Sequence, residues 1–290
     1  MSFRQVIIAS HVKLELKLGY LVCRGEKNIK VHLSEISTLI IQSTAVAITA
    51  ALLCELVKNN VKVIFCDEKC SPHSELLPYY GGYNGSKRLL NQISWSEEIK
   101  GEIWQMIIKK KILCQAENMF LLGKNAVGEK LLALADDVRI ADVTNREGHA
   151  ARFYFEGAFG ENFVRGSESG KNGYLNYGYA ILLSAFNRAL CAQGYNTRLG
   201  IWHKNEYNDY NLSCDLMEPF RPYVDRIVFE LESNDKDFKR KLVDSLNKKT
   251  TINGQVTTLE NAISIYARSV INALNDGEPN GVVFADGYEL

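Results

Sequence analysis

Three side chains of types that bind divalent metal ions stand in short, widely separated segments of the chain. They are Glu147 in TNREGHAARFYF, His203 in GIWHKN and Glu218 in NLSCDLMEPFRPYVD. Carboxylate oxygens and imidazole nitrogens are ligands for hard and borderline divalent ions. Only folding can bring the three together, so a shared metal site is a prediction about tertiary structure.

Each of these residues also has an ordinary structural interpretation. Glu147 follows Thr144 by three residues, which is the spacing of a helix capping box. A single histidine such as His203 is more often a hydrogen-bonded residue than a metal ligand. Asp215 and Glu218, also three residues apart, could form an exposed acidic helix face. The argument for a site therefore depends on the three candidate ligands together.

The segment around Glu218 departs most from an ordinary surface helix. Apolar residues such as Leu216 and Phe220 surround its acids, and a buried carboxylate needs a counter-charge or a metal. Pro219 and Pro222 interrupt the helix, because proline lacks a backbone donor. A broken helix frees carbonyl groups and makes room for an ion or ligand.

The elements that must position these residues are of two kinds. Up to Cys66 the sequence alternates apolar and polar residues as half-buried strands do, and one apolar helix is expected from Ser43 or Thr44 to Asn60. After Lys87, apolar residues recur at helical spacing, which indicates amphipathic helices. Between the two, SPHSELLPYYGGYNGS is rich in proline and glycine and predicts a linker.

The composition is that of a cytosolic globular protein. Apolar residues make up 46% of the chain, no apolar run approaches the roughly 20 residues of a membrane span, and the N-terminus lacks signal-peptide features. We therefore expect a cytoplasmic protein with no membrane partner. The seven cysteines include no CxxC pair, which fits reduced thiols. A zinc site at Cys66, Cys70 and His73 is disfavoured, because no second ligand pair stands at a suitable spacing.

Two other features could contact nucleic acid. In the linker, Tyr79, Tyr80 and Tyr83 could stack on bases, although pinning the linker to a domain surface is the favoured interpretation. The basic run 109–111 most simply predicts a solvated helix face that could touch phosphate. The net charge of zero decides nothing, because binding follows local patches of charge.

With these segments in view, the chain resembles the CRISPR-associated integrase that inserts new spacers, the catalytic member of the universal CRISPR adaptation pair, in its type II form. The resemblance covers essentially the whole chain. It is carried by N-R-E-G-H-A-A-R-x-Y-F at Asn145–Phe155, N-x-x-L-N-Y-G-Y at Asn172–Tyr179, G-x-x-H-K-N at Gly200–Asn205 and D-L-M-E-P-F-R-P-x-V-D at Asp215–Asp225. The last motif is specific by itself, and the others are specific in combination.

The resemblance implies an α+β protein with a small N-terminal β-rich dimerisation domain (residues 1–72), a linker (73–86) and a larger all-α catalytic domain (87–290). It implies that Glu147, His203 and Glu218 are the catalytic residues and bind Mg²⁺ or Mn²⁺, with Asp215 as a secondary acidic position. The implied reaction is a transesterification in which the 3′-hydroxyl of protospacer DNA attacks the repeat, accompanied by endonuclease activity. The ion would polarise the phosphodiester.

The resemblance also implies partners. The family works as a homodimer that forms a heterohexamer with a small ferredoxin-like adaptation protein, on double-stranded protospacer and CRISPR repeat DNA. Other type II adaptation proteins could join. Seven cations near the motifs are candidates for holding backbone phosphates: Arg146, Arg152, Arg165, Lys171, Arg188, Lys204 and Arg221.

Other functions are compatible with the same residues. A stand-alone metal-dependent nuclease on branched or single-stranded DNA would use the same ligands, whereas a non-catalytic DNA-binding scaffold would not need them. An iron oxygenase is disfavoured because the cluster contains one histidine instead of two. A tyrosine recombinase would need a clustered set of Arg and His that the sequence lacks.

Overall fold

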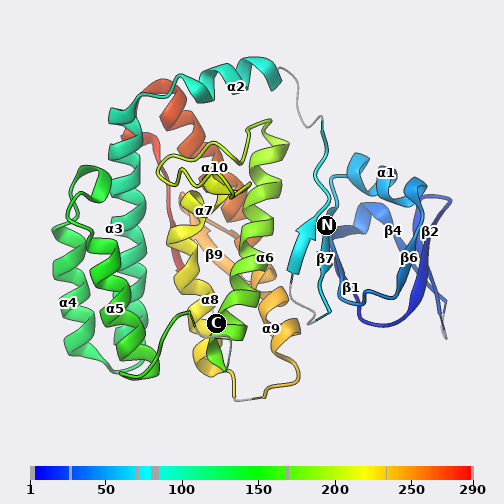
Figure 1. The fold of residues 1–290 in the computed structure, drawn as a ribbon, viewed down its shortest axis with the longest axis horizontal. Helices are drawn as coiled ribbons and strands as arrows, with labels where there is room; N and C mark the ends of the chain where they lie inside the picture. Colours follow the sequence, from blue (N-terminus) through cyan, green and yellow to red (C-terminus); the bar gives the residue numbers. More distant parts are fainter. Residues whose placement is uncertain are drawn as a thin grey trace. The chain divides into compact units, whose positions relative to one another are not determined.

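The computed structural model describes residues 4–25, 28–68, 72–79, 85–166, 170–232 and 234–288. The chain divides into two compact units, Met1–Gly81 and Gly82–Leu290 (Figure 1). The first unit is built mainly from strands and the second mainly from helices. The predicted fold class, an N-terminal β-rich part followed by a larger helical part, is confirmed. No helix in the described ranges is long and apolar enough to cross a membrane.

Two four-stranded sheets form the N-terminal unit. The first has the order β1-β5-β7-β8, with β1 (Arg4–Ile8), β5 (Ile36–Ile41) and β7 (Lys62–Cys66) parallel and β8 (Pro72–Glu75) antiparallel. The second has the order β4 (Ile29–His32), β3 (Tyr20–Arg24), β2 (Val12–Lys17) and β6 (Val46–Ile48). Buried apolar side chains from both sheets and from helix α1 (Ala50–Lys58) make one core.

Helix α1 begins later than predicted. Ser43 and Thr44 precede β6, which pairs with β2, and Thr49 caps the helix by accepting a hydrogen bond from the Leu52 N–H at 3.4 Å. The β-branched residues Val46 and Ile48 suit an extended strand, so tertiary pairing shortens the helix at its start. The helix ends at Lys58, just before the predicted stop.

The predicted linker, residues 73–86, contains most of β8 and the first residues of α2 (Gly85–Ile93). The division between the two units falls inside it. Residues 80–84, which include Tyr80 and Tyr83, lie outside the described part of the chain, as does Cys70, so the interpretations of these two tyrosines and the zinc site are not tested. Tyr79 is described and is 98% exposed, which does not fit a side chain that pins the linker to a domain surface. The domain bounds 1–72 and 87–290 stay a prediction.

Helix α3 (Glu97–Leu121) is the centre of the C-terminal unit. It packs against α4 (Asn125–Asp136), α5 (Arg146–Phe159), α7 (Asn211–Met217), α8 (Arg221–Glu230) and α10 (Leu259–Asp276). No residue between Ile99 and Ala116 is exposed, as expected of a helix enclosed by others. The single solvated face expected for the run 109–111 is therefore wrong for Lys111, which is 8% exposed.

The remaining elements complete this unit. Helix α6 (Lys171–Ala192) packs against α7, α8, α9 (Phe238–Asp244) and α10. Short 3₁₀ turns occur at η2 (Ile140–Asp142), η3 (Glu218–Phe220), η4 (Ser245–Asn247) and η5 (Pro279–Gly281). A small antiparallel sheet that the sequence analysis did not predict has the order β10 (Gln255–Thr258), β9 (Lys249–Ile252) and β11 (Ala285–Tyr288).

Gly178 lies where α6 packs closely onto α8, so its substitution tests this packing. A Cβ on Gly178 would lie 2.4 Å from Val224 Cγ1 and 3.2 Å from Leu242 Cδ2. Gly178→Ala should therefore lower the free energy of unfolding by about 1–3 kcal/mol, the usual cost of overpacking. Urea denaturation measures the change.

Gly173→Ala in the same helix is the matched control. Nothing lies within 4 Å of the Cβ that it would add, and alanine favours a helix over glycine by up to about 1 kcal/mol. Equal losses of stability in the two variants would contradict the close packing.

Candidate metal-binding active site

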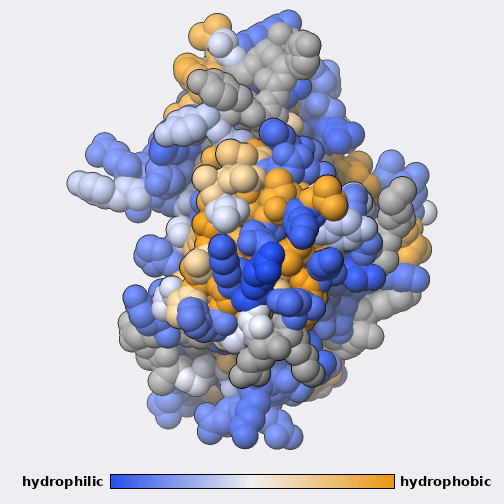
Figure 2. Space-filling model, turned by 90° about the vertical axis from the view of Figure 1, so that its right-hand side faces the viewer, coloured by the Kyte–Doolittle hydropathy of each residue, from blue (hydrophilic) through white to orange (hydrophobic). Residues whose placement is uncertain are grey.

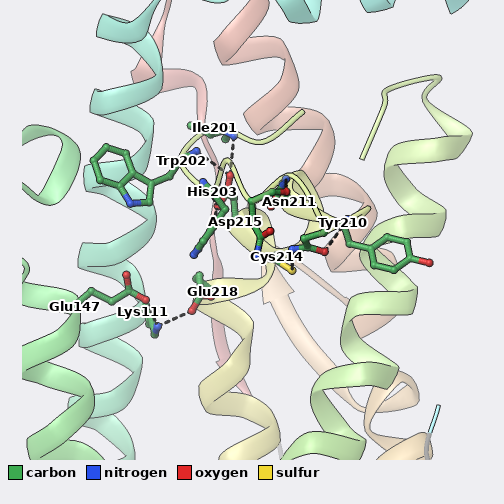
Figure 3. Close-up of polar contacts among 12 residues, drawn as sticks. Lys111, Glu147, Ile201, Trp202, His203, Tyr210, Asn211, Cys214, Asp215 and Glu218 are labelled. Carbon is green, nitrogen blue, oxygen red and sulfur yellow. Dashed lines mark hydrogen bonds and ion pairs between the residues drawn. The ribbon is translucent and has the colours of Figure 1, made fainter. Parts of the chain in front are cut away.

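Four parts of the C-terminal unit converge on one place (Figure 3). Helix α3 supplies Lys111 and the start of α5 supplies Glu147. The segment between α6 and α7 supplies His203, and the break between α7 and α8 supplies Glu218. The structure thus brings the three predicted ligands to the same site, together with a lysine that the sequence analysis did not assign to it.

The predicted break in the helix is present. Helix α7 ends at Met217, the 3₁₀ turn η3 carries Glu218, and α8 begins at Arg221 with a proline in its first turn. The acids of this segment are buried, with Asp215 0%, Glu218 3% and Asp225 1% exposed. The alternative of an exposed acidic face is therefore wrong, because this segment packs against α3 and α6.

Two cations neutralise the buried Glu218 carboxylate. Lys111 Nζ lies 2.5 Å from its Oε2, and Arg221 lies 3.0 Å from its Oε1. Burial alone would raise the pKa of Glu218, but Arg221 and Lys111 outweigh that effect and hold the pKa below its usual value. Glu218 is therefore an ionised carboxylate at neutral pH, as a metal ligand must be.

Glu147 is the second residue of helix α5 and does not cap it. The cap is Asn145, whose Oδ1 accepts from the Gly148 N–H at 3.3 Å. Asp142 also serves this helix end, because its carboxylate accepts from the Arg146 and Glu147 N–H groups at 2.8 and 3.0 Å. The predicted capping box of Thr144 and Glu147 is therefore wrong. The Glu147 side chain instead accepts a hydrogen bond from Lys111 at 2.6 Å.

Asp215 organises the loop that carries His203. Its carboxylate accepts hydrogen bonds from three successive backbone N–H groups, of Ile201 at 2.6 Å, Trp202 at 2.9 Å and His203 at 3.2 Å. It also accepts from His203 Nδ1. These contacts leave Nε2 as the histidine nitrogen that can bind a metal. A carboxylate behind a histidine is the usual support of a metal-bound imidazole.

The pKa shifts of this pair follow from the contacts. The hydrogen bond to Asp215 raises the pKa of His203 and outweighs the opposing effect of burial. Burial raises the pKa of Asp215, and the hydrogen bonds from His203 and the backbone offset this only in part. Asp215, a secondary acidic position in the sequence analysis, is a positioning residue in the structure.

The loop also requires a glycine and an asparagine. A Cβ at Gly200 would lie 2.4 Å from the His203 carbonyl oxygen and 2.8 Å from Asp215 Oδ2, so only glycine allows this close approach. Asn211 donates from its side chain to the carbonyls of Arg198 and Asn205 at 3.1 and 2.9 Å. An irregular segment thus holds His203 in a defined place.

Aromatic rings support the same loop from α3. Trp104 is fully buried and stacks on Trp202 with ring centroids 5.7 Å apart and planes 10° apart. Trp104 also meets the His203 ring edge to face at 5.7 Å. Trp202 remains 43% exposed, so one end of the site is a partly exposed aromatic surface.

Lys111 occupies the space between the two carboxylates. No group of three His, Cys, Asp or Glu side chains in the described ranges is placed so that it could hold a metal ion. The predicted ligands surround one place without closing on it, because an ammonium group lies between Glu147 and Glu218. The donor set nevertheless fits a divalent ion, since two carboxylates already hold a cation there and His203 has its supporting carboxylate.

A buried hydrogen-bond network lies behind the site. Asp225 accepts from the hydroxyl groups of Tyr154 at 2.9 Å and Tyr179 at 2.5 Å, and Asn118 donates to Tyr154 at 2.8 Å. Burial raises the pKa of Asp225 to about 6, against the hydrogen bonds from the two tyrosines, which lower it. The network joins α3, α5, α6 and α8, of which α3 carries Lys111, α5 carries Glu147 and α8 begins with Arg221.

The seven candidate DNA-binding cations all have acceptors within the chain. These are Asp137 for Arg146, Glu156 for Arg152, Asn172 and Asn176 for Arg165, the Val228 and Leu231 carbonyls for Lys171, Glu260 for Arg188, Glu97 for Lys204 and Glu218 for Arg221. Arg188 binds the half-buried Glu260 and Lys171 binds backbone carbonyls, so we assign structural roles to both. Arg152 and Lys204 have exposed side chains that can exchange partners.

Lys111 is a residue of the site that the sequence analysis did not predict. It stands in a basic run with Lys109 and Lys110, which suggested a solvated face. The signal lay in helical spacing, because Lys111 follows Trp104 by seven residues and Ile107 by four, and such positions share one helix face. Both of those residues are fully buried.

Comparison with known proteins places this chain in a family. The sequence profile of "CRISPR associated protein Cas1" matches residues 6–258. The chain belongs to the Cas1 family. It is 37% identical over 233 residues to the CRISPR-associated endonuclease Cas1 of Neisseria meningitidis, covering 80% of this chain and 76% of the relative. It is 26% identical over 297 residues to a Cas1 endonuclease of Francisella tularensis subsp. novicida, covering 90% and 92%.

Solved structures share the fold of this Cas1 chain. A casposase bound to its integration product has a TM-score of 0.79 at 20% identity, covering 96% of this chain and 91% of the other. A Cas1 protein from Thermotoga maritima has a TM-score of 0.73 at 14% identity, covering 93% and 97%. A chain of a Cas6-RT-Cas1–Cas2 complex has a TM-score of 0.77 at 17% identity, covering 97% and 36%.

The role of Asp215 can be tested through the ionisation of His203. Asp215→Asn should lower the pKa of His203, because the hydrogen-bonded carboxylate raises it and burial of the ring, which lowers it, remains. Titration of the ring signals by NMR, with labelled histidine and no added metal, measures the shift.

Asp209→Asn is the control, because Asp209 lies in the same loop, pairs with Arg198 at 2.7 Å and is exposed. An unchanged or higher His203 pKa in the Asp215 variant would contradict the assigned contact.

Proposed function

We propose that this chain is the integrase of CRISPR adaptation, acting on DNA in the cytoplasm. In the proposed reaction the 3′-hydroxyl of protospacer DNA attacks a phosphodiester of the repeat, and the repeat strand leaves with a new 3′-hydroxyl. Hydrolysis with water at the same site would give endonuclease activity. The observation that carries the proposal is the convergence of Glu147, the buried Glu218 and the Asp215-supported His203 in a member of the Cas1 family.

Glu147, His203 and Glu218 would hold Mg²⁺ or Mn²⁺, with Glu147 and Glu218 offering oxygen and His203 offering Nε2. When bound, such an ion activates a phosphodiester and an attacking hydroxyl group. The chain contributes orientation, because Asp215 fixes the imidazole and Arg221 keeps Glu218 ionised. No side chain need form a covalent bond to DNA.

A pocket beside His203 supports an approach route for DNA. It has a volume of about 520 Å³, and its lining includes His203, the cations Lys100, Arg198 and Lys204, and the acids Glu97, Glu206 and Asp209. Lys204 pairs with exposed Glu97 at 3.2 Å, a contact of small energy that phosphate can replace. Of the seven candidate cations, we propose Lys204 and Arg152 as the first to examine for phosphate contacts.

We also propose the partners of this chain. The related fold of a casposase occurs with an integration product, and another occurs in a complex with Cas2. By analogy, this chain would bind double-stranded protospacer and repeat DNA, and two homodimers would flank a dimer of a small ferredoxin-like partner. Other type II adaptation proteins could join that assembly.

Apolar surface supports self-association. Figure 2 shows apolar side chains gathered near the middle of one face and bordered by hydrophilic ones. In the N-terminal unit, Leu18 is 88% and Ile29 is 55% exposed, and several strand residues pack against the core while only partly buried. A larger exposed apolar patch usually marks an interaction surface.

Glu147→Gln should abolish joining of DNA ends to a repeat plasmid while leaving folding and metal-free DNA binding largely intact. The change keeps the shape of a residue that caps no backbone group, and it removes a charge needed to hold the ion. We expect the rate of joining to fall at least about a hundredfold, as it does when one preorganised electrostatic group is removed from an active site. Strand transfer with the small partner protein, with and without Mn²⁺, measures it.

Glu156→Gln is the matched control, since Glu156 lies on the same helix and pairs with the exposed Arg152. Joining by the Glu147 variant at the wild-type rate would favour the non-catalytic scaffold. DNA cleavage without any joined product in the wild-type protein would favour the stand-alone nuclease. Glu218→Gln is a harsher test, because it leaves the half-buried Arg221 without its charged partner and Lys111 with Glu147 alone.

The proposed homodimer predicts a single species of twice the chain mass, about 65 kDa from a 32.7 kDa chain, in light scattering at micromolar concentration. The formal net charge of zero imposes no overall repulsion between copies. Monomer alone under these conditions would contradict it.

A further inference from the structure

Lys111 differs from a solvent-facing lysine because its ammonium group contacts two carboxylates of the site. Its Nζ lies 2.6 Å from Glu147 Oε1 and 2.5 Å from Glu218 Oε2. Its side chain is only 10% exposed, on a helix enclosed by the rest of the unit. It therefore links two acids from different elements, α5 and η3, through one ammonium group.

Lys111 supplies one of the two positive charges that lie against Glu147 and Glu218. Glu147 and Glu218 carry two negative charges, and Lys111 and Arg221 carry two positive ones. Burial alone would lower the pKa of Lys111, but Glu218 and Glu147 outweigh it and raise the pKa. Without the ammonium group the two carboxylates would face each other with one remaining cation, which is unfavourable in a site of low dielectric constant.

A divalent ion held by Glu147 and Glu218 would need the same carboxylate oxygens. The ammonium group lies within hydrogen-bond distance of both, so it and the ion are alternatives for one place. An ion that binds must release Lys111 from its two partners, and a buried ammonium group without an anion is costly. Binding of the ion alone thus carries a penalty that depends on Lys111.

DNA provides the anion that removes this penalty. Glu147 is 26% and His203 43% exposed at the side chain, whereas Glu218 is buried, so the site opens toward solvent beside Lys111. A phosphate that enters on this side would meet the released ammonium group next to the carboxylates. Phosphate is a strong acceptor for a charged donor.

We propose that Lys111 is a built-in counter-ion that couples metal binding to DNA binding. Its ammonium group competes with the ion for Glu147 and Glu218 and passes to a DNA phosphate when both are bound. The inference rests on the proposed metal site. By linkage, DNA then strengthens metal binding through Lys111 and the metal strengthens DNA binding by the same factor.

The experiment measures Mn²⁺ binding to the full-length protein by electron paramagnetic resonance of the free ion. It is done alone and with a short duplex whose 3′ ends are dideoxy and cannot attack. Lys111→Met should bind Mn²⁺ about tenfold or more tightly than wild type without DNA, because breaking a buried ion pair frees two carboxylates. The strengthening by DNA should be smaller in this variant than in wild type.

Lys111→Arg keeps the competing charge and should behave like wild type. Lys110→Met is the matched control, because Lys110 is the adjacent residue on α3 and pairs with Asp286 at 2.9 Å, away from the ligands. Lys111→Gln, which retains a polar side chain, is measured in parallel, and circular dichroism shows which variants are folded.

A thermal scan adds a second measure, in which Mn²⁺ should raise the melting temperature of Lys111→Met more than that of wild type.

The outcomes separate this inference from the proposed function. Unchanged Mn²⁺ binding in both Glu147→Gln and Glu218→Gln would mean that the metal site itself is wrong. Loss of binding in those variants, with Lys111→Met and Lys111→Gln binding no more tightly than wild type, would overturn only the competition. Tighter binding with an unchanged effect of DNA would overturn the transfer of Lys111 to phosphate. A merely structural lysine predicts weaker binding in both Lys111 variants.

Discussion

Two carboxylates of like charge, Glu147 and Glu218, face each other at the edge of a packed helical unit, and the rest of the site follows from the need to neutralise them. Glu218 is almost fully buried, so it requires a counter-charge to remain ionised. Lys111 and Arg221 provide it from two different helices. The position of α3 against α5 and α8 is therefore tied to electrostatics as well as to apolar packing.

His203, by contrast, is held in place by hydrogen bonds. His203 lies on an irregular loop, which by itself would have many conformations and a large ordering cost. Asp215 removes that freedom by accepting hydrogen bonds from three consecutive backbone N–H groups and from the ring. Trp104 of α3 adds packing by stacking on Trp202 of the loop. One buried acid thus determines both the course of the loop and which imidazole nitrogen is presented.

Much of this could be predicted from the sequence. Alternating strands, the helical spacing after Lys87, and the proline-interrupted segment at Glu218 follow from local patterns, and the structure shows all three. The capping of α5 could not be predicted, because Asn145 and Asp142 compete with Thr144 for the same N–H groups and only the chain's path into the helix decides between them. Lys111 was missed because three adjacent lysines look alike in sequence. Successive residues of a helix point in different directions, so Lys111 is buried whereas Lys109 and Lys110 are only partly buried.

The site residues come from four elements that are far apart along the chain, and this has a consequence for synthesis. A growing chain displays Glu147 more than fifty residues before His203 and about seventy before Glu218, so no nascent or truncated fragment that stops within α6 contains the ligand set. The helix α10, which packs against α3 and α6, is made later still. An enzyme that cuts and joins DNA would be dangerous to its own cell as a loose fragment. The proposed ligand set is therefore complete only once Glu218 has been made, and the helices around it are complete only once α10 has followed.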